Sequence, residues 1–446
     1  MVMGTDGPGF SRRSLLRGAG LVGLGGLLSG CGSALAAGVA GTAPPGNTLS
    51  YWNLLGGGDG LRMQAMEQAY QKQHPKIALS SVVLAWGNPY YTKVSLATLG
   101  QRPPDVAISH LTRASILAQA GLLEPLNKSE LAPYGLTGGN FTPAAWDMAH
   151  TNGTLYAIPL DTHPLVMYYN TDICKKAGLL GKDGRLKNLD DPAALTDALT
   201  AAKKVTGAYG GVISINSDTA TQWRFFSSLY YQLGGSVLAD DGRKIVLDEA
   251  KAEKVLSFIQ NLVKQGLIPT SVDYPGAITT FATGKAGFYF EGDWEITTFQ
   301  TTKTPFSMTA FPNVFGGRYA VQADSHSFVL PKDPRRTDAM RQKIFVFIRS
   351  LLGQSGTWAQ GGHIPAWLPF QKSAAYDKLN PASNYKQVAN YVRYDERAWY
   401  SGSGSDFENI MGFAIGAVSA GQMAPAAAIA DMKSRLAQYA NTPSPV

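Results

Sequence analysis

Short apolar runs alternate with longer stretches of helical periodicity through the first folded part of the chain. Runs bounded by Pro or Gly are typical of buried strands, and apolar residues three and four positions apart are typical of helices packed on one face. In chain order the pattern predicts a strand at 48–53 ending in a Gly-rich loop at 54–60, a helix through Met63, Met66 and Tyr70 that stops before Pro75, a strand at 77–85, a helix at 90–99, a strand at 104–109 and a helix closed by Gly121. This alternation favours a largely parallel sheet covered by helices.

A second block of similar character follows. Asp191-Pro192 has the order of an N-cap followed by a first-turn proline, which predicts a helix start. Asp241-Gly242 between two short apolar runs predicts a hairpin turn. Amphipathic stripes at 255–262 and 344–351 predict helices. Such stripes are far more often core than function, so we assign them to packing.

The N-terminal residues differ from the rest of the chain. Arg12 and Arg13 precede an uncharged stretch rich in Leu and Gly that is too short for a comfortable membrane span. The order resembles a twin-arginine export signal, with the general secretory route left open, and Leu28-Ser29-Gly30-Cys31 resembles a lipobox, in which the Cys is diacylated. A transmembrane helix with an incidental Cys is disfavoured. We expect a signal peptide at 1–30 and, because small residues and Pro cannot bury a core, a flexible tether at 31–47.

Charge and cysteine content narrow the function. The formal net charge is +7 and no basic tract accompanies it, which disfavours nucleic-acid binding. Of the two cysteines, Cys31 is the expected lipid site and Cys174 stands alone, so the mature chain has no pair for a disulfide. The sequence has no Cys-x-x-Cys and no Cys/His pair at metal spacing, which disfavours a zinc site.

Short motifs in a fixed order run through nearly the whole mature chain. They are Tyr51-Trp52-Asn53 with the Gly-rich loop, Pro104-Asp105-Val106 with 121–126, 155–159 with Tyr168-Tyr169-Asn170, 284–288 with Glu291-Gly292-Asp293-Trp294, and Gly362-His363-Ile364-Pro365. Each motif alone is weak, but the ordered set is specific. It resembles the family 1 extracellular solute-binding proteins of ABC importers, of the carbohydrate type.

The resemblance implies an α/β, two-lobed periplasmic-binding-protein-like fold of type II, with a ligand cleft between lobes joined by crossing hinge segments. The implied bounds are 48–160 and 312–367 for lobe 1, 161–311 and 368–446 for lobe 2, and crossings near 159–163, 311–313 and 365–370. It further implies an exported protein, held at the outer face of the cell membrane by lipidated Cys31, that captures a sugar for the permease subunits of an ABC transporter. Catalysis and cofactors are not implied, and we expect a monomer.

A sugar presents hydroxyls at its edge and weakly apolar C–H faces, so its site needs hydrogen-bonding side chains and aromatic platforms. The aromatic candidates, each with ordinary core packing as an equal alternative, are Trp86, Trp223, Trp294 and Tyr400. The polar candidates are Asn53, Ser109, His110, Asp161, Thr162, His163, Glu291, Ser325, His326 and His363. Asp161 ranks first, because a charged acceptor makes the stronger hydrogen bonds; its alternative is an N-cap or a brace in the hinge.

Three other functions stay open at lower rank. A glycerophosphodiester could use Arg113, Arg224 or Arg393, but Asp161 and Glu291 would repel its phosphate. A metal ion as the ligand is suggested by the histidines of the expected cleft, yet they are scattered singly along the sequence. A glycosidase could pair Asp161 with Glu291, although the chain has neither Gly-x-Ser-x-Gly nor His-Glu-x-x-His. The sequence does not determine which sugar is bound, whether a mono- or oligosaccharide or an amino sugar.

Overall fold

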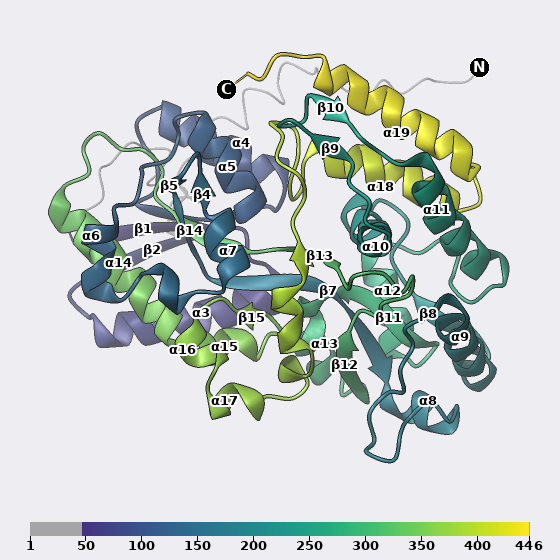
Figure 1. Cartoon of the computed structure of the whole chain (residues 1–446). Helices are drawn as coiled ribbons and strands as arrows, with labels where there is room; N and C mark the ends of the chain where they lie inside the picture. The colour runs from purple at the N-terminus through teal and green to yellow at the C-terminus, as the bar shows by residue number, and fades with distance from the viewer. Residues whose placement is uncertain (1–46, 446) are drawn as a thin grey trace, which may run out of the picture.

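The first lobe is built on a five-stranded sheet in the order β2-β1-β3-β14-β6 (Figure 1). In the computed structural model, which describes residues 47–445, its strands are β1 (Thr48–Asn53), β2 (Ala78–Val83), β3 (Val106–His110), β6 (Ala157–Pro159) and β14 (His326–Val329). β1 pairs in parallel with β2 and β3, whereas β14 returns from the other lobe and runs antiparallel to β3 and β6. The predicted parallel pairing is therefore confirmed for the first three strands.

Helices cover this sheet, and those at 57–73, 88–99, 111–119 and 338–353 lie where the apolar spacing predicts them. The covering helices are α3 (Gly57–Gln73), α4 (Asn88–Leu99), α5 (Leu111–Gln119), α6 (Lys128–Leu131), α7 (Pro143–Met148), α14 (Asp338–Gly353) and α15 (Ser355–Ala359). The three apolar residues that predicted α3 are all buried. The loop expected at 54–60 is wrong in its second half, because α3 begins at Gly57. Asp59 accordingly lies in the first turn, where the free N–H groups of a helix favour a negative charge.

The second lobe is built on a sheet in the order β16-β13-β7-β11-β8, with β12 and β15 also paired to β7. Its strands are β7 (Asp161–Asn170), β8 (Tyr209–Val212), β11 (Ala286–Gly292), β12 (Phe306–Ala310), β13 (Val321–Asp324), β15 (Ile364–Pro365) and β16 (Val392–Arg393). Its longer helices are α8 (Thr171–Lys176), α9 (Pro192–Thr206), α10 (Thr219–Gln232), α11 (Glu249–Lys264), α12 (Tyr274–Ala282), α13 (Ile296–Thr301), α18 (Asp406–Ser419) and α19 (Pro425–Ala440). Every residue of β7 is buried, so this strand is the centre of the lobe.

Local signals at helix starts and turns are confirmed in this lobe. Asp191 is the N-cap of α9, and its Oδ1 accepts a hydrogen bond from the backbone N–H of Ala194 at 2.8 Å. The predicted turn joins β9 (Leu238–Ala239) to β10 (Lys244–Ile245) in an antiparallel hairpin. Asp241 and Gly242 have φ angles of 53° and 84° there, a left-handed conformation that Asp and Gly tolerate.

Shorter elements complete the chain. They are the hairpin β4 (His150–Thr151) with β5 (Thr154–Leu155), the helices α16 (Leu368–Gln371) and α17 (Ala374–Asp377), and the 3-10 turns η1 (Ala132–Tyr134), η2 (Gly138–Asn140), η3 (Asp293–Glu295) and η4 (Ala382–Asn390). Of these, η3 follows β11 directly and places Asp293 beside the junction of the lobes.

The chain passes between the lobes three times at one place. Leu160 separates β6 from β7, Ser325 separates β13 from β14, and β15 pairs with the first two residues of β7. The second crossing corrects the expected one at 311–313, since the segment 312–324 assigned to lobe 1 contains β13, which pairs with β7 and β16 of the second lobe. β13 and β14 are both buried and one residue apart, so the hydrophobic pattern has no signal for the change of sheet.

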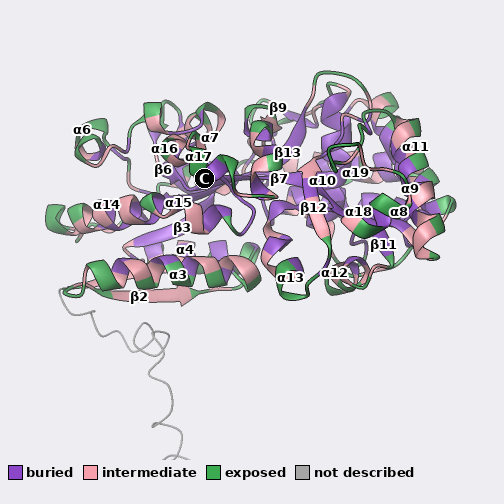
Figure 2. Ribbon diagram, turned by 90° about the horizontal axis from the view of Figure 1, so that it is seen from below, coloured by how far each residue is buried: buried purple, intermediate pink, exposed green. Residues whose placement is uncertain are grey.

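Each lobe has its own hydrophobic core, and the strands lie between helices whose outer faces are exposed (Figure 2). Phe370 packs against both cores, within the segment 365–370 where the third crossing is expected. Over residues 47–445, no helix combines the length and the apolar run that a bilayer span requires. The expected signal peptide, the lipid site Cys31 and nearly all of the tether lie outside the described residues.

Candidate functional site

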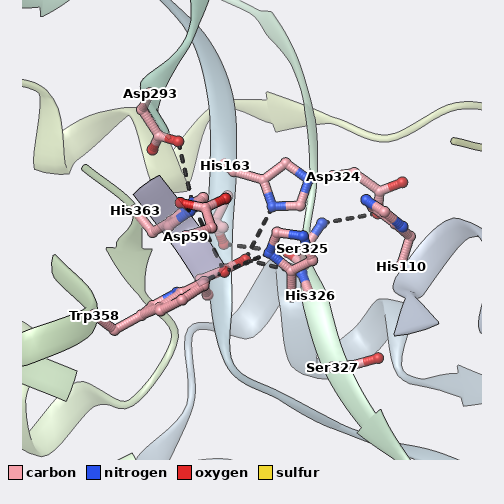
Figure 3. Close-up of polar contacts among 12 residues, drawn as sticks. Asp59, His110, His163, Asp293, Asp324, Ser325, His326, Ser327, Trp358 and His363 are labelled. Atoms are coloured by element: carbon pink, nitrogen blue, oxygen red, sulfur yellow. Dashed lines mark hydrogen bonds and ion pairs between the residues drawn. The ribbon is translucent and has the colours of Figure 1, made fainter. Parts of the chain in front are cut away.

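The three crossings bring most of the polar candidates together (Figure 3). The residues that meet there are His110 at the end of β3, Asp161, Thr162 and His163 at the start of β7, Ser325 between β13 and β14, His326 at the start of β14, and His363 before β15. The register explains the meeting, because His163 lies opposite Asp324 and His326 lies opposite His110. All seven candidates are buried.

Asp161 lies at the centre of this group and is saturated with donors. Its Oδ1 accepts hydrogen bonds from the backbone N–H of His326 at 2.8 Å and from the Nδ1 of His163 at 3.0 Å. Its Oδ2 accepts from the Nδ1 of His326 at 2.8 Å and from the Nε1 of Trp358 at 2.7 Å. Burial alone would raise the pKa of Asp161, but His326, His363 and His163 together hold that pKa well below its ordinary value.

His363 connects the two lobes through carboxylates. Its Nε2 lies 2.9 Å from Oδ1 of Asp59 on α3, and its Nδ1 lies 3.3 Å from Oδ1 of Asp293 on η3. The imidazole stacks on Trp358, with the ring centroids 4.5 Å apart and the planes 8° from parallel. Burial would lower the pKa of His363, but Asp59, Asp293 and Asp161 raise it well above its ordinary value. A positive charge on this ring is therefore favoured.

The other histidines form a group of neighbouring rings. His163 and His326 have ring centroids 4.3 Å apart, and His110 lies 4.9 Å from His326 and 5.5 Å from His163. Burial, followed by the charge of His326, lowers the pKa of His163 to about 3 and that of His110 well below its ordinary value. His163 and His110 are therefore neutral at physiological pH. The Nδ1 of His110 is hydrogen-bonded to the hydroxyl of Tyr91 at 2.7 Å.

Glu291 lies in the second lobe at the end of β11. Its Oε2 accepts a hydrogen bond from the hydroxyl of Thr221 at 2.8 Å, and its Oε1 accepts from the backbone N–H of Gly292 at 2.9 Å. Burial and Asp218 raise the pKa of Glu291 to about 8, and Arg224 opposes that shift. The carboxyl is thus held within its own lobe.

The aromatic candidates divide into two pairs. Trp294 is half-buried with its ring centroid 5.9 Å from that of His163, and Trp86 is 44% exposed with its centroid 6.5 Å from that of His110. These two rings lie beside the crossings. Trp223 is instead 0% exposed in the core of the second lobe, where its Nε1 donates to Asp395 at 2.9 Å.

Tyr400 likewise has a packing role, because it is buried and its hydroxyl donates to the carbonyl oxygen of Gly242 at 2.7 Å. Asn53 orders the turn after β1, where its Oδ1 accepts from the backbone N–H of Leu55 at 3.1 Å. Ser109 donates to the carbonyl oxygen of His110 at 3.0 Å and lies opposite Ser327.

Sequence reasoning missed three residues that touch the histidines, namely Asp59, Asp293 and Trp358. Asp59 lies in the Gly-rich segment and Asp293 within the motif that precedes Trp294, so both were inside regions already singled out. Their roles depend on contacts between separate segments, 70 positions apart for Asp293 with His363, 197 for Trp358 with Asp161 and 304 for Asp59 with His363, for which helical or strand periodicity carries no signal.

Comparisons with known proteins agree with this architecture. A model of the bacterial extracellular solute-binding proteins matches residues 55–348. The arabinooligosaccharide-binding protein of Bacillus subtilis (strain 168) is 29% identical over 258 residues, which are 56% of this chain and 53% of that protein. A maltooligosaccharide ABC transporter solute-binding lipoprotein of Streptococcus pneumoniae serotype 4 is 25% identical over 325 residues, which are 68% of this chain and 69% of that protein.

Among solved structures, the GacH receptor of Streptomyces glaucescens, determined unliganded and with acarbose, has a TM-score of 0.74. It is 17% identical, and the match covers 88% of this chain and 98% of that one, which shows the shared fold. The chain spans about half the length of the Bacillus relative. The family match, by contrast, covers well over half of this chain, from the end of β1 to α14. The chain therefore belongs to the bacterial extracellular solute-binding protein family.

Proposed function

We propose that the protein is the extracytoplasmic solute-binding component of an ABC importer and that it captures a sugar between its lobes. The observation that carries the proposal is the placement of hydrogen-bonding and aromatic side chains beside the three crossings. A ligand bound there would contact both lobes, so closure of the lobes would be favoured when it is present. The relatives named for arabinooligosaccharides and maltooligosaccharides support the choice of a sugar.

Trp294 supplies the best stacking face for a sugar ring. The guanidinium of Arg224 lies 5.2 Å from its ring centroid, and its Nε1 donates to the hydroxyl of Tyr274 at 2.8 Å, which fixes the orientation of the indole. Gly292 makes room for it, since a Cβ at that position would lie 1.8 Å from the ring. Trp86 lies on the other lobe. One ring from each lobe is an arrangement that suits the C–H faces of a sugar.

Hydroxyl and imidazole groups supply the hydrogen bonds in this proposal. The hydroxyls of Ser325 and Tyr394 lie 2.7 Å apart, and Ser325 lies 3.4 Å from the hydroxyl of Thr162. Neutral His110 adds a ring nitrogen that either donates or accepts, depending on its tautomer. These groups match the mixed donor and acceptor character of sugar hydroxyls.

The charges at the junction favour a neutral or amine-bearing sugar over a glycerophosphodiester. Asp161, Asp293 and Asp324 are all buried there. Arg113 lies over the ring of Tyr91 at 4.4 Å and Arg224 lies 3.9 Å from Glu408, so both cations already face a partner. Arg393, the third candidate for a phosphate, lies over the ring of Tyr231 at 4.9 Å. A phosphate bound there would lie near these carboxylates, while the three arginines already face other groups.

The geometry favours binding over catalysis. A glycosidase needs two carboxyl groups that face each other across the bond to be cleaved. Asp161 is engaged with four donors and Glu291 with three, so both carboxyl groups act as acceptors for the protein itself. Export, a lipid at Cys31, delivery to permease subunits and a monomeric state complete the proposal; they rest on the sequence and on the family.

A melting-temperature screen tests this function. The panel contains arabinooligosaccharides, maltooligosaccharides, mannitol, amino sugars and glycerophosphocholine, because a ligand that binds only the folded state raises the melting temperature. We expect one class of sugar to raise it in a concentration-dependent manner and to be recovered unchanged afterwards. A shift with glycerophosphocholine alone, or cleavage of the bound sugar, would contradict the proposal.

A further inference from the structure

Three histidine nitrogens surround one carboxylate at the junction of the lobes. The Nδ1 of His163 lies 3.0 Å from Oδ1 of Asp161, and the Nδ1 atoms of His326 and His363 lie 2.8 Å and 3.8 Å from its Oδ2. One ligand atom from each of these four residues lies within 4.8 Å of the others. Figure 3 shows the three rings turned toward one another from three separate segments of the chain.

These distances suit a common metal ion. With Zn–N bonds of about 2.0–2.1 Å in a tetrahedral site, neighbouring ligand atoms are separated by roughly 3.3 Å. The three nitrogen–oxygen distances fall on both sides of that value, and all four ligand atoms lie within 4.8 Å of one another, so the ligands would have to draw together around the ion. Asp161 and His163 are two positions apart on β7, a spacing that places side chains on the same face of a strand.

In the described part of the chain, three buried polar atoms beside this cluster make no well-formed hydrogen bond. The Nδ1 of His363 and both carboxylate oxygens of Asp293 are buried without a hydrogen-bond partner within residues 47–445. Both side chains are 0% exposed, and the closest approach between them is the 3.3 Å contact from Nδ1 of His363 to Oδ1 of Asp293. Buried groups of this kind normally have a partner, an ordered water or an ion.

Neighbouring residues form hydrogen bonds to His363 and Asp161 of the kind that supports metal ligands in proteins. Asp59 accepts from the Nε2–H of His363 at 2.9 Å, which leaves the Nδ1 facing Asp161 and Asp293, and an ion bound there would displace the proton on Nδ1. Asp161 is held by the indole N–H of Trp358 and by the backbone N–H of His326. A carboxylate behind a histidine and hydrogen bonds to a ligating carboxylate are typical of protein metal sites.

We propose that Asp161, His163, His326 and His363 bind one divalent transition-metal ion, with Zn²⁺ as the best-matched ion, where the three crossings meet. The ion is a resident of the hinge and not the transported solute, so the inference goes beyond the proposed function and stands apart from it. Nitrogen ligands with one carboxylate favour Zn²⁺ over Mg²⁺ or Ca²⁺, which prefer oxygen. The ion would join β7, β14 and the segment before β15, and thus both lobes.

The test uses the exported protein produced without a polyhistidine tag, treated with EDTA and desalted. Zn²⁺ is titrated calorimetrically, and Co²⁺ is added as a spectroscopic probe whose visible absorption reports tetrahedral nitrogen coordination. We expect one equivalent of either ion to bind and the melting temperature to rise on loading and fall with EDTA. The absence of saturable binding in this protein would overturn the proposal, whatever the variants do.

Substitutions of the proposed ligands and of a control histidine test where the ion binds. His326→Ala and His363→Ala should abolish the Co²⁺ spectrum, and Asp59→Asn should weaken Zn²⁺ binding by roughly 10- to 100-fold, since it removes only the support of His363. The matched control His150→Ala replaces a histidine outside the cluster, whose Nδ1 is hydrogen-bonded to the carbonyl oxygen of Trp146 at 2.8 Å, and should leave the affinity unchanged. Binding that survives both ligand variants, or that His150→Ala removes, would place the ion elsewhere and overturn the assignment. If a ligand variant does not fold, Asp59→Asn and the spectrum of the unaltered protein decide.

Discussion

Two tryptophans with similar sequence contexts differ in how far they are buried. Trp223 and Trp294 both fall in segments expected near the ligand, yet Trp223 is sealed in the second core against Phe226 and Phe407. Trp294 is half-buried beside His163. A ring enclosed on all sides contributes to stability, whereas a ring with an accessible face can also contact a ligand. The same distinction assigns packing to Tyr400 and leaves Trp86 as a candidate.

Replacement of these two tryptophans should therefore have opposite effects. Trp294→Ala removes a stacking face and should weaken sugar binding by about 1–3 kcal/mol with little change in the melting temperature of the free protein. Trp223→Ala leaves a cavity in the core and should lower the free energy of unfolding by about 3–5 kcal/mol. Calorimetric titration and thermal unfolding of both variants measure this. Loss of affinity at unchanged stability in Trp223→Ala would show that the assignment is reversed.

The helices and strands could be predicted well where a signal is local. The strand at 48–53, the N-cap at Asp191 and the turn at Asp241-Gly242 depend on a few neighbouring residues, and all three are confirmed. The start of α3 was missed, because Gly residues at 56–60 read as a loop. The sheet to which 321–324 belongs could not be predicted either, since pairing with β7 is a contact between distant segments.

The candidate site was predictable as a set of residue types but not as a geometry. His110, His163, His326 and His363 were singled out from their places in expected loops. Their spacing in the sequence argued against a metal site, yet the fold brings three of them to one carboxylate. Proximity that arises from three crossings of the chain cannot be read from spacing along it.

The contact between α10 and α18 should make stability depend on pH. Glu408 on α18 is buried, and burial raises its pKa from 4.5 to about 7, an effect opposed by Arg224 on α10 and strengthened by Asp395 and Asp218. Between pH 4.5 and 7 the unfolded chain has released this proton and the folded chain still holds it, so stability falls as the pH rises through this window. Above pH 7 this contribution is constant.

Glu408→Gln removes the titrating group and should flatten the decline of the melting temperature between pH 5 and pH 8, by a few kcal/mol at most in the free energy of unfolding. The difference in slope is the readout, because loss of the partner of Arg224 also changes the baseline. Glu253→Gln, on the exposed face of α11, serves as the control and should keep the slope of the unaltered protein. An unchanged slope in Glu408→Gln would show that Glu408 does not hold its proton in the folded state.

At the scale of the whole molecule, two lobes with separate cores meet at three crossings and also touch beside them, where α3 lies against η3 and α13 and where residues 397–403 face the first lobe. The backbone N–H of Ser403 donates to the hydroxyl of Thr112 on α5 at 3.1 Å, and Arg397 donates to the carbonyl oxygen of His150 at 2.8 Å. These contacts join segments of different lobes. We therefore expect rotation about the crossings to open and close the molecule without disturbing either core.

A measurement of the distance between the lobes tests directly whether the sugar is captured between them. Spin labels at Leu96→Cys on α4 and Phe413→Cys on α18 occupy exposed positions, one on each lobe, in a chain with Cys31 replaced; Cys174 is buried. Addition of the sugar found in the melting-temperature screen should shift the measured distances to shorter values, because the ligand holds the lobes together. A sugar that binds with unchanged distances would contradict capture between the lobes.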